Sequence, residues 1–118
     1  MLGLNPFDRG LAYGDGIFRT FLVKNSEPIH WKLHYSRLCF DLNIVNITPP
    51  KESLFLKDIK ALFPTKGIFV GKIIITRGIS ERGYQYPKIE KHTRILLKSQ
   101  FKEINPKLYI NGVALGVC

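Results

Sequence analysis

Cysteine is scarce in this sequence: Cys39 and Cys118 are the only two, and they lie far apart in the chain. Disulfide-dependent small domains carry larger sets of cysteines, and zinc sites place cysteines or histidines in closely spaced pairs. His30, His34 and His92 do not have that spacing. The sequence therefore gives no sign of a disulfide framework or a metal site, and its cysteine usage fits a reducing cytoplasm best.

Long apolar runs are also missing. No stretch approaches the roughly 18 apolar residues that a membrane-spanning helix requires, and residues 1–6 lack the basic start and apolar core of a signal peptide. Of the 118 residues, 45% are hydrophobic, so we expect one globular domain without repeats or linkers. A cytoplasmic protein without a membrane partner is the expected class.

Acidic residues are few, nine against eighteen lysines and arginines, and the net charge is +9. Nucleic-acid binding needs basic residues clustered on one face with exposed aromatics, whereas the lysines here are scattered from Lys24 to Lys107. A solvated basic surface is the simplest interpretation. A site that attracts small polyanions is the alternative, because a positive field raises their local concentration.

Hydrophobic periodicity predicts an α+β fold, a mostly antiparallel sheet with two helices packed on one face. Strands are expected at residues 17–24, 29–30, 67–76, 93–99 and 108–114. The segment 67–76 is a nearly continuous apolar run of β-branched residues. Such a run is typical of a central strand that is covered on both sides.

Two helices are expected between the second and third of these strands. The first spans residues 31–45, where apolar residues recur at three-and-four spacing: Trp31, Leu38, Leu42 and Val45. The second is expected to open at Thr48, as its cap, and at Pro49, as its first residue. Its expected buried stripe is Phe55, Ile59, Leu62 and Phe63. Pro64 and Gly67 are expected to end it.

Three glycines and two aspartates gather between residues 8 and 16, directly before the first strand. Glycine reaches positive φ without steric cost, and aspartate accepts hydrogen bonds from its own turn. Gly14-Asp15-Gly16 therefore predicts a tight turn that leads into the strand. A plain hairpin turn is the alternative, since Asp-Gly is a common short hairpin signal.

Two other clusters of polar residues are candidates for a site. Arg37 lies one helical turn from both His34 and Asp41, which places the three residues on one face of the helix. If Arg37 points into a cleft, its planar guanidinium can bind an anion such as phosphate through two parallel hydrogen bonds. A surface ion pair with Asp41 is the alternative. After the strand 67–76, a loop carries Thr76-Arg77-Gly78 and then Arg82-Gly83-Tyr84. It is either a carboxylate-binding loop or a solvated connector.

The order and content of these motifs resemble the class IV aminotransferases, pyridoxal-phosphate enzymes of fold type IV. The motifs are Asp8-Arg9-Gly10 with Gly14-Asp15-Gly16-Ile17-Phe18, His34-Tyr35-Ser36-Arg37-Leu38, and Thr76-Arg77-Gly78 with Arg82-Gly83-Tyr84. Together they span most of the chain. The family includes D-amino-acid and branched-chain aminotransferases and a 4-amino-4-deoxychorismate lyase branch, which forms 4-aminobenzoate and pyruvate on the folate pathway.

The resemblance implies roles for individual residues. Arg37 corresponds to the residue that binds the phosphate of pyridoxal 5'-phosphate. Phe18, Arg82 and Tyr84 correspond to residues that hold the substrate carboxylate, on a loop that reaches into the partner subunit of a homodimer. Phe18-Arg19-Thr20 and Arg82-Gly83-Tyr84 resemble the lyase branch more than the aminotransferases. Its substrate is a small dianion, which a basic site would suit.

The resemblance also implies a missing part. The family's Schiff-base lysine comes from a second domain, in a Gly-x-Lys pattern, and nothing in residues 1–118 matches that motif. Residues 1–107 are expected to be the N-terminal domain, and 108–118 the start of a connection to an absent C-terminal domain. We expect a truncated chain that is inactive alone, and binding of the cofactor by this chain stays open. An aminotransferase or a non-catalytic basic binding module are the alternatives.

Overall fold

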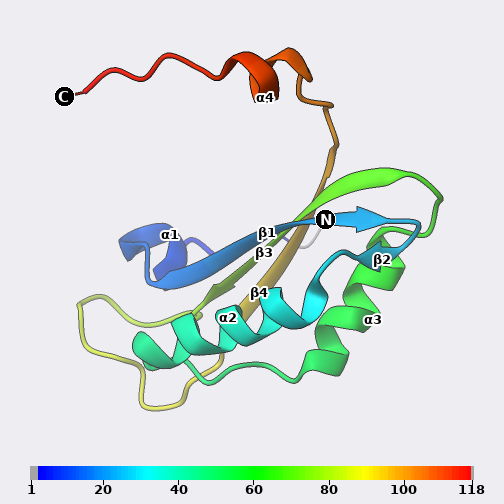
Figure 1. Ribbon diagram of the computed structural model, residues 1–118. Coiled ribbons are helices and arrows are strands. Elements are labelled where there is room, and N and C mark those ends of the chain that lie inside the picture. The colour runs from blue at the N-terminus through cyan, green and yellow to red at the C-terminus, as the bar shows by residue number, and fades with distance from the viewer. Residues whose placement is uncertain (1–2, 118) are drawn as a thin grey trace.

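A sheet of four antiparallel strands in the order β2-β1-β3-β4 forms the centre of the molecule. The computed structural model describes residues 3–117. Outside the described residues lie Met1 and Leu2, the first residues of the expected N-terminal domain, and Cys118, the last residue of the expected connection. The elements are α1 Arg9–Tyr13, β1 Gly16–Lys24, β2 Glu27–Pro28, α2 Trp31–Ile44, α3 Glu52–Leu62, β3 Ile68–Thr76, β4 Thr93–Gln100 and α4 Lys107–Asn111. Helices α2 and α3 lie against one face of the sheet (Figure 1). The predicted α+β fold is confirmed.

The hydrophobic core lies between α2, α3 and the sheet face that they cover. Its almost fully buried side chains are Phe21, Val23, Leu38, Leu42, Ile47, Phe55, Ile59, Phe63, Ile73 and Ile75. The side chains of a strand alternate between its two faces, and here the odd-numbered residues of β1 and β3 enter the core. Of the apolar positions expected on the two helices, Leu38, Leu42, Phe55, Ile59 and Phe63 are buried. Trp31, Val45 and Leu62 are partly buried and pack against this core.

Among residues 3–117, no helix covers most of the opposite face of the sheet (Figure 1). Along β3 the burial alternates: Gly71, Ile73 and Ile75 are buried, while Lys72 and Ile74 between them stay partly exposed. The expectation that this strand is covered on both sides is therefore wrong for the described residues. We call this the open face; its central side chains are Phe18, Thr20, Leu22, Val70, Lys72, Ile74, Ile95, Leu97 and Ser99.

Three element boundaries differ from the sequence prediction at the N-terminal side of the helices. α1 was not expected. The return strand expected at residues 29–30 is wrong: β2 is formed by Glu27–Pro28, and His30 has a φ of +53°, which a strand does not adopt. α3 begins at Glu52 rather than Pro49, since the Thr48 backbone N–H and hydroxyl both bind the Glu90 carboxylate and cap no helix.

The strand expected at 108–114 is wrong as well: α4 and an irregular segment occupy these positions. Asn105 starts a helical turn there, because its carbonyl accepts from the Leu108 N–H at 3.0 Å and its side-chain oxygen accepts from the Lys107 N–H at 3.0 Å. Figure 1 shows this C-terminal arm, residues 105–117, standing away from the sheet. A strand would need a sheet edge to pair with, and the arm has none beside it.

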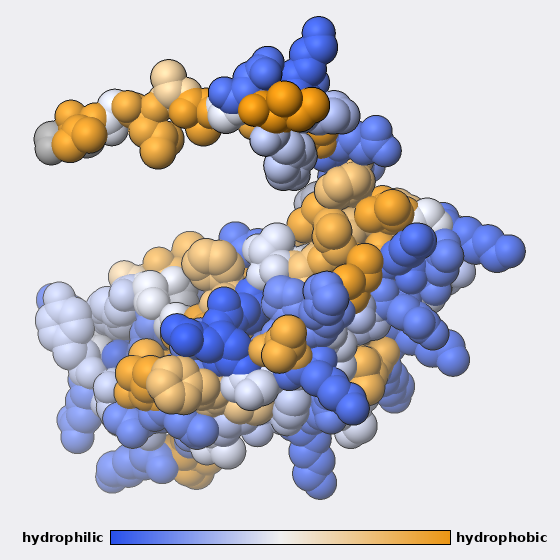
Figure 2. Space-filling model, in the orientation of Figure 1, coloured by the Kyte–Doolittle hydropathy of each residue, from blue (hydrophilic) through white to orange (hydrophobic). Residues whose placement is uncertain are grey.

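The C-terminal arm carries many exposed apolar side chains, seen as a row above the main body in Figure 2. Ile110 is 83% exposed and Leu115 is 87% exposed.

The radius of gyration is 17.0 Å, against about 13.5 Å for a compact domain of this length. No helix among the described residues has the length and apolar character needed to cross a membrane.

Gly71 provides a test of the packing between β1 and β3. A Cβ at this position would lie 2.9 Å from two ring atoms of Phe21, inside the core. We expect Gly71→Ala to lower the free energy of unfolding by about 1–3 kcal/mol because of this overpacking. The measurement is urea unfolding followed by the fluorescence of Trp31, the single tryptophan.

The matched control is Gly116→Ala in the arm, where an added Cβ meets no atom within 4 Å. We expect its unfolding midpoint to equal that of the unmodified chain. Equal midpoints for Gly71→Ala and Gly116→Ala would contradict the packing described for β1 and β3.

Candidate functional site

Asp8 joins three segments at one end of the open face. Its Oδ1 accepts from the Gly10 N–H at 2.8 Å and caps α1, while its Oδ2 accepts from the hydroxyls of Thr76 at 3.0 Å and Thr93 at 2.6 Å. Asp8 is fully buried. Gly10 passes so close to Thr76 that a side chain at position 10 would clash with it. α1 is thereby fixed against the ends of β3 and β4.

Asp15 lies at the centre of a second polar network, between two buried arginines. Its Oδ2 accepts from Arg9 Nε at 2.7 Å and from Arg77 Nε at 2.8 Å, and its Oδ1 accepts from Arg77 Nη2 at 3.1 Å. Both arginine residues are 3% exposed. Burial raises the pKa of Asp15, but the hydrogen bonds from Arg77 and Arg9 outweigh burial and hold the pKa below its ordinary value. The bond to Asp15 likewise raises the pKa of Arg77, against the effect of burial.

Arg77 also fastens the end of α2 to this network. Its Nη2 donates to the Val45 carbonyl at 2.6 Å, and its Nη1 donates to the Asn46 carbonyl at 2.8 Å. Carbonyls at a helix C-terminus lack partners within the helix, and a cation satisfies them. The guanidinium lies 3.8 Å from the ring centre of Tyr86. Arg77, expected on a site loop, is thus a buried structural residue.

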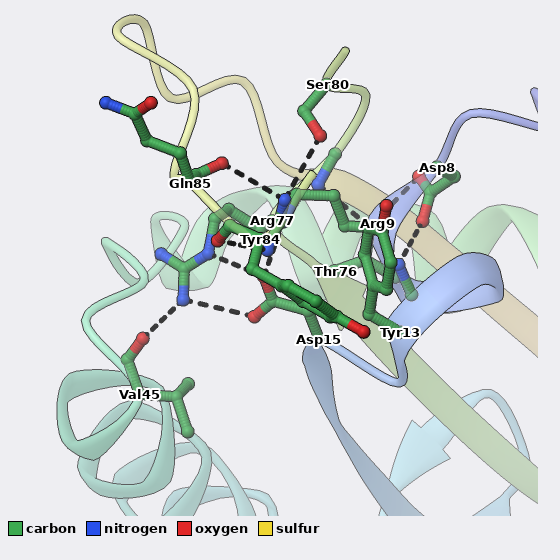
Figure 3. Close-up of polar contacts among 12 residues, drawn as sticks. Asp8, Arg9, Tyr13, Asp15, Val45, Thr76, Arg77, Ser80, Tyr84 and Gln85 are labelled. Atoms are coloured by element: carbon green, nitrogen blue, oxygen red, sulfur yellow. Dashed lines mark hydrogen bonds and ion pairs between the residues drawn. The ribbon is translucent and has the colours of Figure 1, made fainter. Parts of the chain in front are cut away.

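Arg9 holds the loop that follows β3. Its Nη1 donates to Ser80 Oγ at 3.2 Å, to the Gly83 carbonyl at 3.1 Å and to the Gln85 carbonyl at 3.2 Å. Its Nη2 donates to the Tyr84 carbonyl at 3.3 Å. Figure 3 shows these bonds converging on one guanidinium from the loop. The loop between β3 and β4, residues 77–92, is therefore ordered around Arg9 and Arg77.

The loop presents Arg82 and Tyr84 to solvent. The Tyr84 side chain is 83% exposed, and its ring lies 5.3 Å from that of Tyr13. The Tyr13 hydroxyl accepts from the Gly83 N–H at 3.3 Å. A cavity of about 810 Å³ lies beside this loop, with Arg82, Glu81 and Lys88 in its wall.

Arg37 lies on the exposed side of α2 with its side chain 63% exposed. Its Nε pairs with Asp41 at 2.9 Å, as in the surface-pair alternative. The same carboxylate pairs with Arg19 Nη2 at 2.8 Å. Two arginines thus share one carboxylate, which leaves a local excess of positive charge. Burial, followed by the charge of Arg19 and then of His30, lowers the pKa of the neighbouring His34.

The cluster around Asp41 has donors that fit an anion of the phosphate class. The buried Nε of Arg19 has no hydrogen-bond partner within residues 3–117. Arg37 uses its Nε for Asp41, and no hydrogen bond to its terminal nitrogens occurs in the described part of the chain. A guanidinium with free terminal nitrogens can hold a phosphate through two parallel bonds. The residues present therefore fit the phosphate of a pyridoxal cofactor.

Phe18 projects from β1 onto the open face and is 60% exposed. Lys72 lies over its ring, 4.5 Å from the centre. β2 pairs only with Val23 and Lys24, so the outer edge of β1 beside Phe18 has no strand partner among residues 3–117. None of the hydrogen bonds or ion pairs in that range joins Arg37 to Phe18, Arg82 or Tyr84. Arg82 and Tyr84 thus lie on one loop, while Phe18 lies on β1 and Arg37 on α2.

The sequence interpretation did not identify Asp15 as the shared partner of two arginines. It assigned Asp15 to a turn, which is confirmed, since Gly14 has a φ of +66° and Gly16 begins β1. The available signal was an acidic residue shortly after the first of two Arg-Gly pairs, Arg9-Gly10 and Arg77-Gly78. These pairs lie far apart in the chain, so pairing across the sheet could not be read from local spacing.

Comparisons with known proteins find relatives over most of the chain. No protein-family model matches the chain. The chain is 33% identical over 94% of its length to a protein named aminodeoxychorismate lyase from Vibrio harveyi, and 30% identical over 97% to one from Bacillus subtilis. It spans 41% of the length of each. The predicted resemblance to aminodeoxychorismate lyase is confirmed.

Solved structures give the same result for the fold. The 4-amino-4-deoxychorismate lyase of Pseudomonas aeruginosa superimposes with a TM-score of 0.79 and 33% identity, over 96% of this chain and 42% of that one. A hypothetical aminotransferase from Mycobacterium tuberculosis, in a form bound to pyridoxal phosphate, superimposes with a TM-score of 0.70 and 19% identity, over 85% of this chain and 34% of that one. The chain has the fold found in one part of these enzymes.

Asp15→Asn tests the network around Asp15. The substitution leaves two buried arginines without a counter-charge, so we expect the free energy of unfolding at pH 7 to fall by about 3 kcal/mol. The ordinary carboxyl pKa is 3.8 and that of Asp15 is lower when folded. Its stabilising effect is therefore present above pH 3.8 and is lost as the pH falls through the folded-state pKa. Urea unfolding between pH 2.5 and pH 7 should show the two proteins converging in acid.

Asp58→Asn is the control, because Asp58 forms a more exposed pair with Arg94 at 2.7 Å. We expect it to cost less than about 1 kcal/mol. If both substitutions lower the free energy of unfolding equally at pH 7, the network around Asp15 stabilises the fold no more than an exposed ion pair does.

Proposed function

We propose that this chain forms one part of a pyridoxal-phosphate-dependent 4-amino-4-deoxychorismate lyase, which converts aminodeoxychorismate to 4-aminobenzoate and pyruvate. The observation that carries the proposal is the 33% identity, over 94% of the chain, with a protein named aminodeoxychorismate lyase. Since the chain spans 41% of that relative, we place the Schiff-base lysine outside the matched part. On its own, the chain is expected to form no 4-aminobenzoate.

In this proposal Arg37 binds the phosphate of the cofactor. The terminal nitrogens of Arg37 and the Nε of Arg19 have no hydrogen-bond partner among residues 3–117, and this supports the assignment. Asp41 keeps both side chains in place, because it accepts a bond from each of them. The bound cofactor supplies an electron sink for the bonds that break next to the substrate nitrogen.

Arg82, Tyr84 and Phe18 are the proposed substrate residues. Arg82 offers a planar cation to a carboxylate, and Tyr84 offers a hydroxyl beside it on the same loop. Phe18 provides an apolar surface at the unpaired edge of β1. The net charge of +9 raises the concentration of a dianionic substrate near such a site.

A homodimer is part of the proposal. In the family that the chain resembles, the loop with Arg82 and Tyr84 reaches into the partner subunit. Both residues are exposed here, and Tyr84 touches only Tyr13 among the aromatic rings of the described residues. Residues 108–117 are proposed to start the connection to the remainder of the enzyme, which fits their separation from the sheet (Figure 1).

A chimeric enzyme tests the reaction. The part of the Vibrio harveyi relative that matches this chain is replaced by residues 1–118, and the product is incubated with pyridoxal phosphate and aminodeoxychorismate. We expect equal amounts of 4-aminobenzoate and pyruvate, since the reaction releases one of each. A parallel incubation supplies a D- or branched-chain amino acid and a 2-oxoacid; amino transfer there, without 4-aminobenzoate from aminodeoxychorismate, would establish the aminotransferase alternative instead.

Arg37→Ala in the same chimera tests the phosphate site. Loss of a bidentate, charge-assisted contact should weaken the apparent affinity for pyridoxal phosphate by about 10–100-fold, measured by titration of the Schiff-base absorbance. Lys32→Ala, which removes an exposed cation from the same helix, should leave the affinity unchanged. Equal losses for both variants would show a general charge effect rather than a site at Arg37.

A further inference from the structure

The loop between β3 and β4 contains a turn that its own backbone does not hold. Residues 80–86 form no strand or helix, and the nearest sheet-type bridges are Asp8 with Ile79 and Gly78 with Lys91. The carbonyls of Gly83, Tyr84 and Gln85 all point to the guanidinium of Arg9. Three consecutive carbonyls that face one point repel each other unless a cation with several donors lies there.

Arg9 is held by contacts other than those with residues 80–86. It is the first residue of α1, which Asp8 caps, and its own N–H donates to the Gly78 carbonyl at 2.8 Å. Its Nε is occupied by Asp15 at 2.7 Å, so the two terminal nitrogens have a fixed direction. The position of the guanidinium is therefore set by Asp15 and α1, and the carbonyls of the loop bind to it there.

The inward carbonyls determine where the side chains of the loop point. With its carbonyl bound to Arg9, Tyr84 directs its ring outward against Tyr13, where it is 83% exposed. Arg82 precedes the first bound carbonyl and is exposed as well. Figure 3 shows the side chains of Tyr84 and Tyr13 beside each other.

We propose that Arg9 is a positioning residue, whose fixed guanidinium sets the conformation of residues 80–86 and thereby the places of Arg82 and Tyr84. The effect on substrate binding rests on the proposed function, whereas the effect on the loop does not. Lysine cannot replace Arg9, because its single nitrogen cannot bind Asp15 and four loop acceptors together.

Trypsin cleavage after Arg82 tests the loop in the chain as it is. The rate is compared with cleavage after Lys107 in the C-terminal arm, which reports protease activity on a segment that Arg9 does not touch. We expect Arg9→Lys to raise the ratio of the two rates by about fivefold or more, through loss of several hydrogen bonds. Arg94→Lys, the same change at the pair with Asp58, should change the ratio by less than about twofold.

A milder variant covers the case that Arg9→Lys does not fold, as judged by Trp31 fluorescence. Ser80→Ala removes one acceptor of Arg9 and keeps the Asp15 pair; we expect the ratio to rise by about twofold. An unchanged ratio in every folded Arg9 and Ser80 variant would overturn the proposal.

Kinetics of the chimera separate positioning from simple stabilisation. Arg9→Lys should raise KM for aminodeoxychorismate by about tenfold with a smaller change in kcat, and combining it with Arg82→Ala should add little. An unchanged KM together with faster cleavage would overturn the positioning role. If the chimera with Arg9 intact makes no 4-aminobenzoate, the proposed function fails, and the cleavage ratio alone decides the role of Arg9 in the loop.

Discussion

The pairing of the Asp15 carboxylate with Arg9 and Arg77 is the interaction on which the rest of this structure depends. One side chain accepts bonds from two buried arginines, one on α1 and one directly after β3. Without it, two cations would be buried side by side, at a cost of several kcal/mol. Arg9 connects this carboxylate to the loop, and Arg77 connects it to the end of α2. One anion thus orders α1, the loop and a helix terminus together.

Charge in this chain is divided between a buried, paired part and an exposed, basic part. Asp8 and Asp15 serve internal donors, and Asp41 and Asp58 each pair with arginines. Few acidic side chains remain to balance the lysines at the surface, so the excess of positive charge faces solvent. This arrangement suits the attraction of small anions better than nucleic acid, because the lysines do not gather on one element.

The fold followed from the sequence where periodicity was strong and local. The helix that begins at Trp31 and the strand that ends at Thr76 were predicted nearly to the residue. The open face was not, because an apolar run looks the same whether one or both of its faces are covered. The strand expected at 108–114 does not form, because residues with β-propensity form a strand only where a neighbouring sheet edge is present to pair with them. The pairing of Asp15 with Arg77 was out of reach, since it depends on the register of β1 with β3.

The bonds of Asp8 impose an order on how the chain acquires its structure. Asp8 binds Thr93, 85 positions further along the chain. Synthesis runs from the N-terminus, so α1 and the residues before β1 wait for most of the chain before their partners exist. β1 meets the same delay, as its neighbour β3 follows two helices. The helices can form first from local contacts, while the loop around Arg9 closes among the last elements.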